Sequence, residues 1–157
     1  GICNGCQFVS GINEIIPGAS NWPKFIKNDS DQYECRLVQL KIENSSSIFF
    51  KGMEGSVIPV MVSHGEGKAV FSKDEENIVA RYVDPNHSTT THYPFNPNGS
   101  AQGVAGVCNN DGRIMIMMPH PERTYLTKQY SWAPKEWGVH SPWFKMFDNA
   151  YQYAKKN

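Results

Sequence analysis

The chain has 157 residues, in which fifteen Lys and Arg side chains balance fifteen Asp and Glu side chains. This balance gives no electrostatic reason to bind nucleic acid or an anionic membrane surface, so we expect neither as a partner. Four cysteines are too few for a disulfide scaffold and favour a reducing, cytoplasmic location. No apolar run approaches the roughly 18 residues of a membrane span, and the length suits one domain.

The first half of the chain mixes helical and extended patterns. Apolar residues follow helical spacing from Phe8 to Ile16, and Pro17 and Gly18 should end that helix. Residues 47–53 suit one or two helical turns. Short apolar, often β-branched runs predict strands at 33–42, 57–62, 68–71 and 78–84, with 57–62 buried.

The second half begins with an irregular segment, 84–100, which is rich in Pro, Asn and Thr. Strands are then expected at 103–108 and 113–118, joined by a hairpin whose Asp-Gly tolerates positive φ. Ser141 and Pro142 should start a last helix. Its predicted buried stripe is Trp143, Phe144, Phe147, Ala150, Tyr151 and Ala154. The pattern favours an α/β fold with a largely central sheet, and nothing marks a domain boundary within 1–157.

A candidate nucleophile lies in the opening segment Gly-Ile-Cys-Asn-Gly-Cys-Gln. Cys3 precedes the predicted helix, where free N–H groups and the helix dipole favour a thiolate. Gly1 and Gly5 lack Cβ atoms, so the chain can turn sharply and leave the sulfur outward, as in a nucleophile elbow. The alternative is a small buried cysteine beside a turn.

Cys3 and Cys6 also form a Cys-x-x-Cys pair. A thioredoxin-like redox pair is therefore a second interpretation, although it needs a βαβ setting. A zinc site would require another close pair, and Cys35 and Cys108 stand far apart. We expect no metal, and we expect Cys6 to be a packed core residue.

A candidate base, His120, follows the strand predicted at 113–118. Pro121 should keep the chain extended, so that Glu122 can turn back and accept from Nδ1–H, leaving Nε2 to face a nucleophile. A polar surface histidine is the alternative. His64 follows another strand in Ser-His-Gly-Glu-Gly, which suits either a ligand contact or a tight turn. His87, His92 and His140 suit solvated loops.

Several segments resemble class I (triad) glutamine amidotransferases, and more narrowly the C-terminal glutaminase domain of the large, purine-pathway phosphoribosylformylglycinamidine synthase. The resemblance covers nearly the whole chain. It rests on Gly-Ile-Cys-Asn-Gly-Cys-Gln (1–7), Ile-Pro-Gly (16–18), Ser-His-Gly-Glu-Gly (63–67), Arg-Tyr-Val-Asp (81–84), Asn-Pro-Asn-Gly-Ser (96–100), Met-Met-Pro-His-Pro-Glu-Arg (117–123), Ser-Trp-x-Pro-x-x-Trp-Gly (131–138) and Pro-Trp (142–143).

The resemblance implies a flavodoxin-like open sheet flanked by helices. It also implies a glutaminase that supplies ammonia to a synthetase, which together form a carbon–nitrogen ligase with glutamine as amido donor. Cys3 would be the nucleophile, His120 the acid–base and Glu122 its orienter. The residues matching glutamine contacts are Asn4, Gln7, Ser63, His64 and Gly65. No cofactor is expected in this domain, since ATP and magnesium would belong to the synthetase domain, its partner in amidating formylglycinamide ribonucleotide.

The family's domain has strands, helices and a glycine-rich loop before the elbow, and this chain begins at the elbow. We therefore expect 1–157 to be the C-terminal portion of that domain, lacking its N-terminal strands. Such a portion should have little glutaminase activity alone, because losing one oxyanion donor costs about 10²–10³ in rate. The backbone N–H of Asn4 could supply one donor.

Two other functions stay open. A non-catalytic docking fragment of the same domain could use the aromatic tail, Trp132, Trp137, Trp143 and Phe144, to contact a partner, although such a stripe also suits a core. A different cysteine hydrolase with a similar elbow is the third interpretation, against which the family segments around His120 argue.

Overall fold

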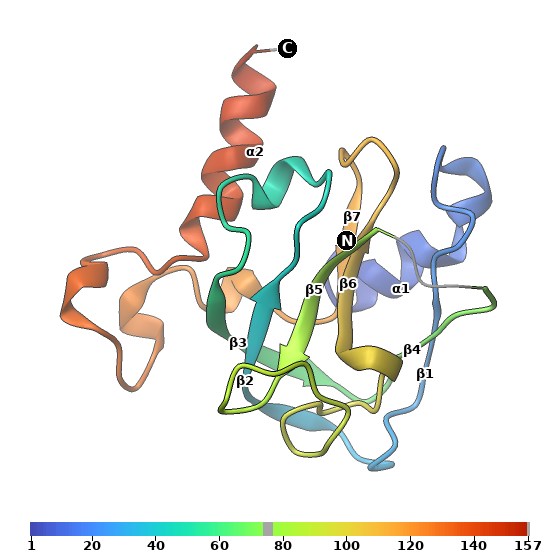
Figure 1. The fold of residues 1–157 in the computed structure, drawn as a ribbon, viewed down its shortest axis with the longest axis horizontal. Helices are drawn as coiled ribbons and strands as arrows, with labels where there is room; N and C mark the ends of the chain where they lie inside the picture. Colours follow the sequence, from blue (N-terminus) through green and yellow to red (C-terminus); the bar gives the residue numbers. More distant parts are fainter. Residues whose placement is uncertain (74–76, 157) are drawn as a thin grey trace.

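A five-stranded antiparallel sheet forms the centre of the fold (Figure 1), in a computed structural model that describes residues 1–73 and 77–156. Its strand order is β3-β2-β5-β6-β7, and β1 and β4 form a separate antiparallel pair. The strands are β1 (Lys24–Ile26), β2 (Glu34–Ile42), β3 (Val57–His64), β4 (Lys68–Val70), β5 (Ile78–Val83), β6 (Val104–Cys108) and β7 (Met115–Met117). The helices are α1 (Asn4–Gly11) and α2 (Phe144–Lys156). The predicted mixed α/β class is confirmed.

The predicted strands are all present, with ends shifted by up to two residues. β2 pairs with β3 from Glu34–His64 to Lys41–Val57, so these two strands form the longest ladder. β6 and β7 form the predicted hairpin, in which Gly112 has φ 73°. Residues 47–53 contain one 3-10 turn, Ile48–Phe50.

β3 is less buried than predicted, because it ends the strand order of the described sheet. Its side chains alternate: Ile58, Val60 and Val62 are buried in the core, whereas Pro59 and Met61 are only half-buried. A proline in β3 is consistent with a position at the edge of the sheet, where one side of the backbone pairs with no neighbouring strand of the sheet.

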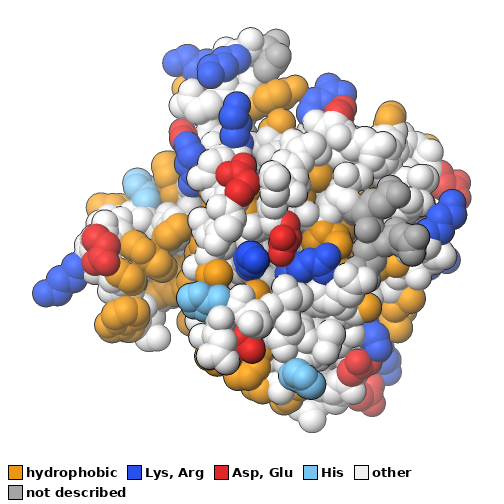
Figure 2. Space-filling model, viewed as in Figure 1, with side chains coloured by type: hydrophobic (Ala, Val, Ile, Leu, Met, Phe, Trp, Pro, Cys, Tyr) orange, Lys and Arg blue, Asp and Glu red, His pale blue; other side chains and the backbone are white. Residues whose placement is uncertain are grey.

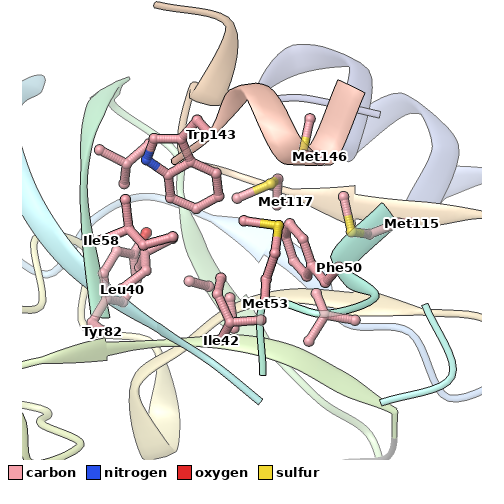
Figure 3. Packing of buried hydrophobic residues seen from close by; sticks show 14 of the residues in the cluster. Leu40, Ile42, Phe50, Met53, Ile58, Tyr82, Met115, Met117, Trp143 and Met146 are labelled. Carbon is pink, nitrogen blue, oxygen red and sulfur yellow. The ribbon is translucent and has the colours of Figure 1, made fainter. Parts of the chain in front are cut away.

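Helix α2 packs against the core by its first turns. Trp143, just before the helix, is fully buried and lies with Met146 above Met117 and Phe50 (Figure 3). The Trp143 indole Nε1–H donates to the Pro59 carbonyl at 2.7 Å, which fixes the ring over β3.

The predicted stripe of α2 is wrong for most of its members. Phe144, Phe147 and Tyr151 are 38%, 36% and 62% exposed, and Ala154 is also exposed. Met146 is the buried residue of the helix instead, and one turn further along the Asn149 side chain donates to the carbonyls of Phe49 and Lys51. These polar contacts orient the helix, and apolar spacing alone does not reveal them.

Helix α1 also differs from its prediction. It ends at Gly11 and is followed by a 3-10 turn, Asn13–Ile15, before Pro17. Cys6 and Ser10 are its buried residues, whereas Phe8 and Ile15 are 68% and 77% exposed. Phe8 of the helix and Ile15 of the following turn therefore point outward, whereas Val9 and Ile16 pack against the core.

Exposed apolar side chains gather on the excursion between β7 and α2, which projects at the left of Figure 1 and is partly orange in Figure 2. Trp132 and Val139 lie in this segment and are 80% and 72% exposed. None of the helices in the described part of the chain has the length and apolarity that crossing a membrane requires.

The position of Trp143 predicts a large effect on stability. Trp143→Ala should lower the free energy of unfolding by about 3–5 kcal/mol, because it removes a fully buried ring from contact with Phe50. Phe144→Ala, at the adjacent and partly exposed position, should cost about 1 kcal/mol or less. Urea denaturation of both variants measures the difference, and equal losses would contradict this packing.

Candidate active site

The chain turns sharply at Cys3. Ile2 pairs with Met117 of β7 in a parallel bridge, and the Cys3 N–H donates to the Met117 carbonyl at 3.0 Å. Cys3 is then the N-cap of α1 with φ 51° and ψ −112°, in a region that a non-glycine residue rarely occupies. This is the geometry of a nucleophile elbow, in which backbone strain presents the side chain at a strand-to-helix turn.

The two glycines flanking Cys3 are not equivalent. A Cβ on Gly1 would lie 2.6 Å from the Gly5 carbonyl oxygen, so the turn requires glycine there. A Cβ on Gly5 would meet no described atom within 4 Å. The predicted steric need is therefore confirmed for Gly1 and wrong for Gly5 within this chain.

The thiol of Cys3 is half-buried, and its S–H donates to the Ser63 carbonyl at 3.6 Å. Burial raises the pKa of this thiol, although the Asn4 N–H and the charge of Arg123 act in the opposite direction. The N–H at the start of α1 therefore favours the thiolate as expected, but burial outweighs it and the net pKa of Cys3 is raised. Deprotonation at neutral pH needs a base beside the sulfur.

His120 and Glu122 form a close pair. The Nδ1–H of His120 donates to Oε1 of Glu122 at 2.6 Å, so the predicted orientation of the ring is present. Pro121 does not keep the chain extended, since it begins a 3-10 turn, Pro121–Arg123, and this turn brings the carboxylate back to the ring. His120 is buried, and its Nε2 has no hydrogen-bond partner among the described residues.

The thiol and the imidazole converge on one strand edge. The His120 N–H donates to the Met61 carbonyl at 2.8 Å, and the Cys3 thiol contacts the Ser63 carbonyl, two residues further along β3. Glu122, the partner of His120, also acts electrostatically on the pKa of Cys3. The thiol S–H donates to the Ser63 carbonyl, and no hydrogen bond joins the sulfur to the imidazole within the described ranges.

The loop after β3 closes the other side of the site. Gln7 Nε2 donates to the Glu66 carbonyl at 2.6 Å and so ties α1 to this loop. Ser63 Oγ lies 2.7 Å from the Tyr33 hydroxyl, and Gly65 is half-buried. Asn4 is exposed at the start of α1. Of the predicted residues, Ser63 thus contacts the Cys3 thiol through its carbonyl, and Gln7 joins α1 to the loop that follows Ser63. The contacts of all five residues to glutamine stay a prediction.

Comparison with known proteins identifies the family. The model of the CobB/CobQ-like glutamine amidotransferase domain matches residues 1–154. The chain belongs to this family. The structure of PurLQS from Thermotoga maritima is 28% identical, with a TM-score of 0.72 over 98% of this chain. A protein described as a GMP synthase subunit from Thermoplasma acidophilum is 16% identical over the whole chain, with a TM-score of 0.53, and shares the fold. The chain spans 60% of the length of each solved chain.

The predicted resemblance to glutamine amidotransferases and their fold is thereby confirmed. The other cysteines of this amidotransferase domain have plainer roles. Cys6 is fully buried under α1 as predicted, Cys35 is exposed and Cys108 is buried. All four thiols are free, so Cys3 and Cys6 form no disulfide here. The described residues contain no group of three or more metal-binding side chains.

Two asparagines of the site give only a polar-turn signal in the sequence. Asn28 holds the loop after β3, since its side chain donates to the His64 carbonyl at 2.8 Å and accepts from the Gly67 N–H at 2.9 Å. Asn98 lies against the His64 ring, 3.3 Å from Nε2. Asn98 belongs to the segment Asn-Pro-Asn-Gly-Ser, but the sequence gives this residue no role, because its contact with His64 depends on tertiary structure.

His64 is buried at the end of β3, with only 3% of its surface exposed. Its ring packs on Gly67, where any Cβ would come within 2.3 Å of the ring atoms. Burial, and then the charge of His120, lowers the pKa of His64 to about 4. The ring is therefore neutral at pH 7.

This burial predicts an acid-sensitive stability. Below pH 6.5 the unfolded chain protonates His64, whereas the folded chain does not until about pH 4, so stability falls across that window. Between pH 7 and 5 the wild type should lose about 2 kcal/mol more than His64→Asn. Urea denaturation at the two pH values measures this, and equal losses would show that the folded ring is readily protonated.

Proposed function

We propose that this domain hydrolyses glutamine through a thioester on Cys3 and supplies the ammonia to a synthetase. The observation that carries the proposal is the convergence of the strained Cys3 elbow and the His120–Glu122 pair on the edge of β3. A buried imidazole with a free Nε2 and a carboxylate on Nδ1 is the arrangement that activates a neighbouring thiol.

In the proposed reaction, His120 Nε2 takes the thiol proton and the sulfur attacks the side-chain carbonyl carbon of glutamine. The proton then passes from His120 to the departing nitrogen, the C–N bond breaks and ammonia leaves. Water cleaves the thioester, with His120 again accepting a proton, and releases glutamate. The raised pKa of Cys3 makes this transfer to His120 essential.

The residues proposed to contact glutamine are those around the elbow and the loop after β3. The Asn4 N–H, at the start of α1, can serve as an oxyanion donor. Gln7 is proposed to place the substrate by its side chain, and Ser63, His64 and Gly65 are proposed to hold the α-amino and α-carboxylate groups of glutamine by their backbone. The Ser63 carbonyl already contacts the Cys3 thiol, and Gln7 joins α1 to the loop after β3.

We propose that the ammonia serves the amidation of formylglycinamide ribonucleotide in purine biosynthesis, within the cytoplasm. The likeness to PurLQS supports this narrower assignment. ATP and magnesium would bind to the synthetase domain, with no cofactor in the amidotransferase domain. The four free thiols suit a reducing compartment.

One observation favours a second function, docking without catalysis. Between residues 132 and 151, Trp132, Val139 and Tyr151 are more than 60% exposed. Phe144 and Phe147, in the same stretch, are more than one-third exposed. Large exposed apolar side chains often mark a protein interface. This surface is compatible with a catalytic domain, so labelling of Cys3 decides between the two functions.

A glutamine-mimicking diazoketone tests the proposed nucleophile. In the full-length protein it should alkylate Cys3, because that thiol lies in the proposed glutamine site, and excess glutamine should prevent the reaction. Peptide mass spectrometry locates the adduct. Iodoacetamide labelling of the exposed Cys35, unchanged by glutamine, is the matched control. An active protein with no adduct at Cys3 would contradict the mechanism.

The role of Glu122 makes a kinetic prediction. Glu122→Gln should lower kcat for glutamine hydrolysis by about 10²–10⁴-fold, because an amide no longer stabilises the protonated imidazole. Steady-state glutamate release measures this loss. Glu66→Gln, on the exposed loop, is the control, because Glu66 contacts Gln7 through its backbone carbonyl and not through its side chain. Similar rates for Glu122→Gln and the wild type would remove Glu122 from the mechanism.

A further inference from the structure

Two buried ring nitrogens of the site lack a hydrogen-bond partner in the described part of the chain. They are His64 Nδ1 and His120 Nε2. The residues are only 3% and 6% exposed. Buried polar atoms in native proteins nearly always have a hydrogen-bond partner in the protein or in water. Two ring nitrogens without a partner in one site therefore point to a bound molecule.

The surroundings of Asn98 determine which His64 nitrogen carries the proton. The Ser100 N–H and hydroxyl both donate to Asn98 Oδ1, at 3.0 and 2.8 Å, which identifies that atom as the oxygen. The amide NH₂ therefore faces His64 Nε2 at 3.3 Å and Tyr82 at 3.1 Å. Since an NH₂ group only donates, Nε2 accepts, and neutral His64 carries its proton on Nδ1.

His120 has the opposite arrangement. Its Nδ1–H is directed at Glu122, so neutral His120 presents Nε2 as an acceptor. The site therefore contains one free buried donor, on His64, and one free buried acceptor, on His120.

One strand positions both histidines. His64 ends β3, and the same strand holds His120 through the Met61 carbonyl. They are close enough for the charge of His120 to lower the pKa of His64. A water that accepts from one ring and donates to the other would satisfy both nitrogens.

We infer that His64 is a positioning residue for the water that cleaves the thioester, with Asn98 holding its ring in the required tautomer. This inference rests on the proposed glutaminase function. His64 Nδ1–H donates to the water oxygen, and the water donates to His120 Nε2. The water oxygen then bonds to the thioester carbonyl carbon as one proton passes to His120. The C–S bond breaks, and the Cys3 thiolate stays paired with protonated His120 while His64 keeps its proton.

The proposed role of His64 is in deacylation, the hydrolysis of the thioester, so its loss should affect only the second half of the reaction. Acylation uses the proton of Cys3 and needs no water, whereas hydrolysis of the thioester does. Loss of the His64 donor should lower kcat with little effect on kcat/KM, and the thioester should accumulate. A ring that merely fills space on Gly67 would not produce that split.

Two amide substitutions in the full-length protein test the donor. The side-chain NH₂ of His64→Asn can take the place of Nδ1–H, whereas that of His64→Gln lies near the Nε2 position. We expect His64→Gln to reduce kcat by about 10²-fold and to accumulate a glutamyl adduct on Cys3 in acid-quenched samples by mass spectrometry. His64→Asn should retain a higher kcat than His64→Gln. The control His92→Gln, at an exposed loop position, should match the wild type.

Hydroxylamine provides a second readout, because it attacks thioesters without an activated water. It should restore turnover of His64→Gln as glutamyl hydroxamate. An equal fall in kcat and kcat/KM, with no adduct, would overturn the role of His64 while leaving the glutaminase intact. Absence of any Cys3 thioester and of glutamate from the wild type would overturn the proposed function itself.

The tautomer can be observed independently of activity. Long-range ¹H–¹⁵N spectra of histidine-labelled protein should show His64 with a pyrrole-type Nδ1 and a pyridine-type Nε2. Asn98→Asp should reverse this, because a carboxylate accepts from Nε2–H, and the variant should accumulate thioester. A wild-type ring protonated on Nε2 would overturn the inference even if Asn98→Asp fails to fold.

Discussion

The outer edge of β3 is the constraint on which the site depends. The Met61 carbonyl holds the backbone of His120, and the Ser63 carbonyl accepts from the thiol of Cys3. Neither contact would exist without the long β2–β3 ladder, which sets the position of every residue along this edge. Cys3 and His120, which are 117 positions apart in the sequence, are thus held by two carbonyls of one strand.

The site concentrates groups that cost stability in isolation. Cys3 has positive φ, its half-buried thiol resists ionisation, and two histidines are almost fully buried. The surrounding core compensates for these costs, since Trp143 and the β3 side chains Val60 and Val62 are fully buried in it. Such a division between a strained site and a well-packed core is typical of enzymes, in which function restricts the choice of local conformation.

The sequence predicted the strands well and the helix faces poorly. Strands such as β5 and β6 follow from short β-branched runs, because the period of two matches burial on either side of a sheet. The rotation of α2 did not follow, since Asn149 orients the helix through contacts to carbonyls about 100 residues earlier. The exposure of Phe8 and Ile15 likewise depends on what packs against α1, which periodicity cannot specify.

By itself, the sequence determined the chemistry available: a thiol before a helix, a histidine and carboxylate two residues apart, and a glycine-rich loop after a strand. These are local patterns, set by side-chain chemistry and short-range backbone geometry. Only the tertiary structure decided that burial raises the pKa of Cys3, that His120 Nε2 is left free, and that Asn98 meets His64. Desolvation and hydrogen-bond partners arise from residues distant in the chain, so no local pattern contains them.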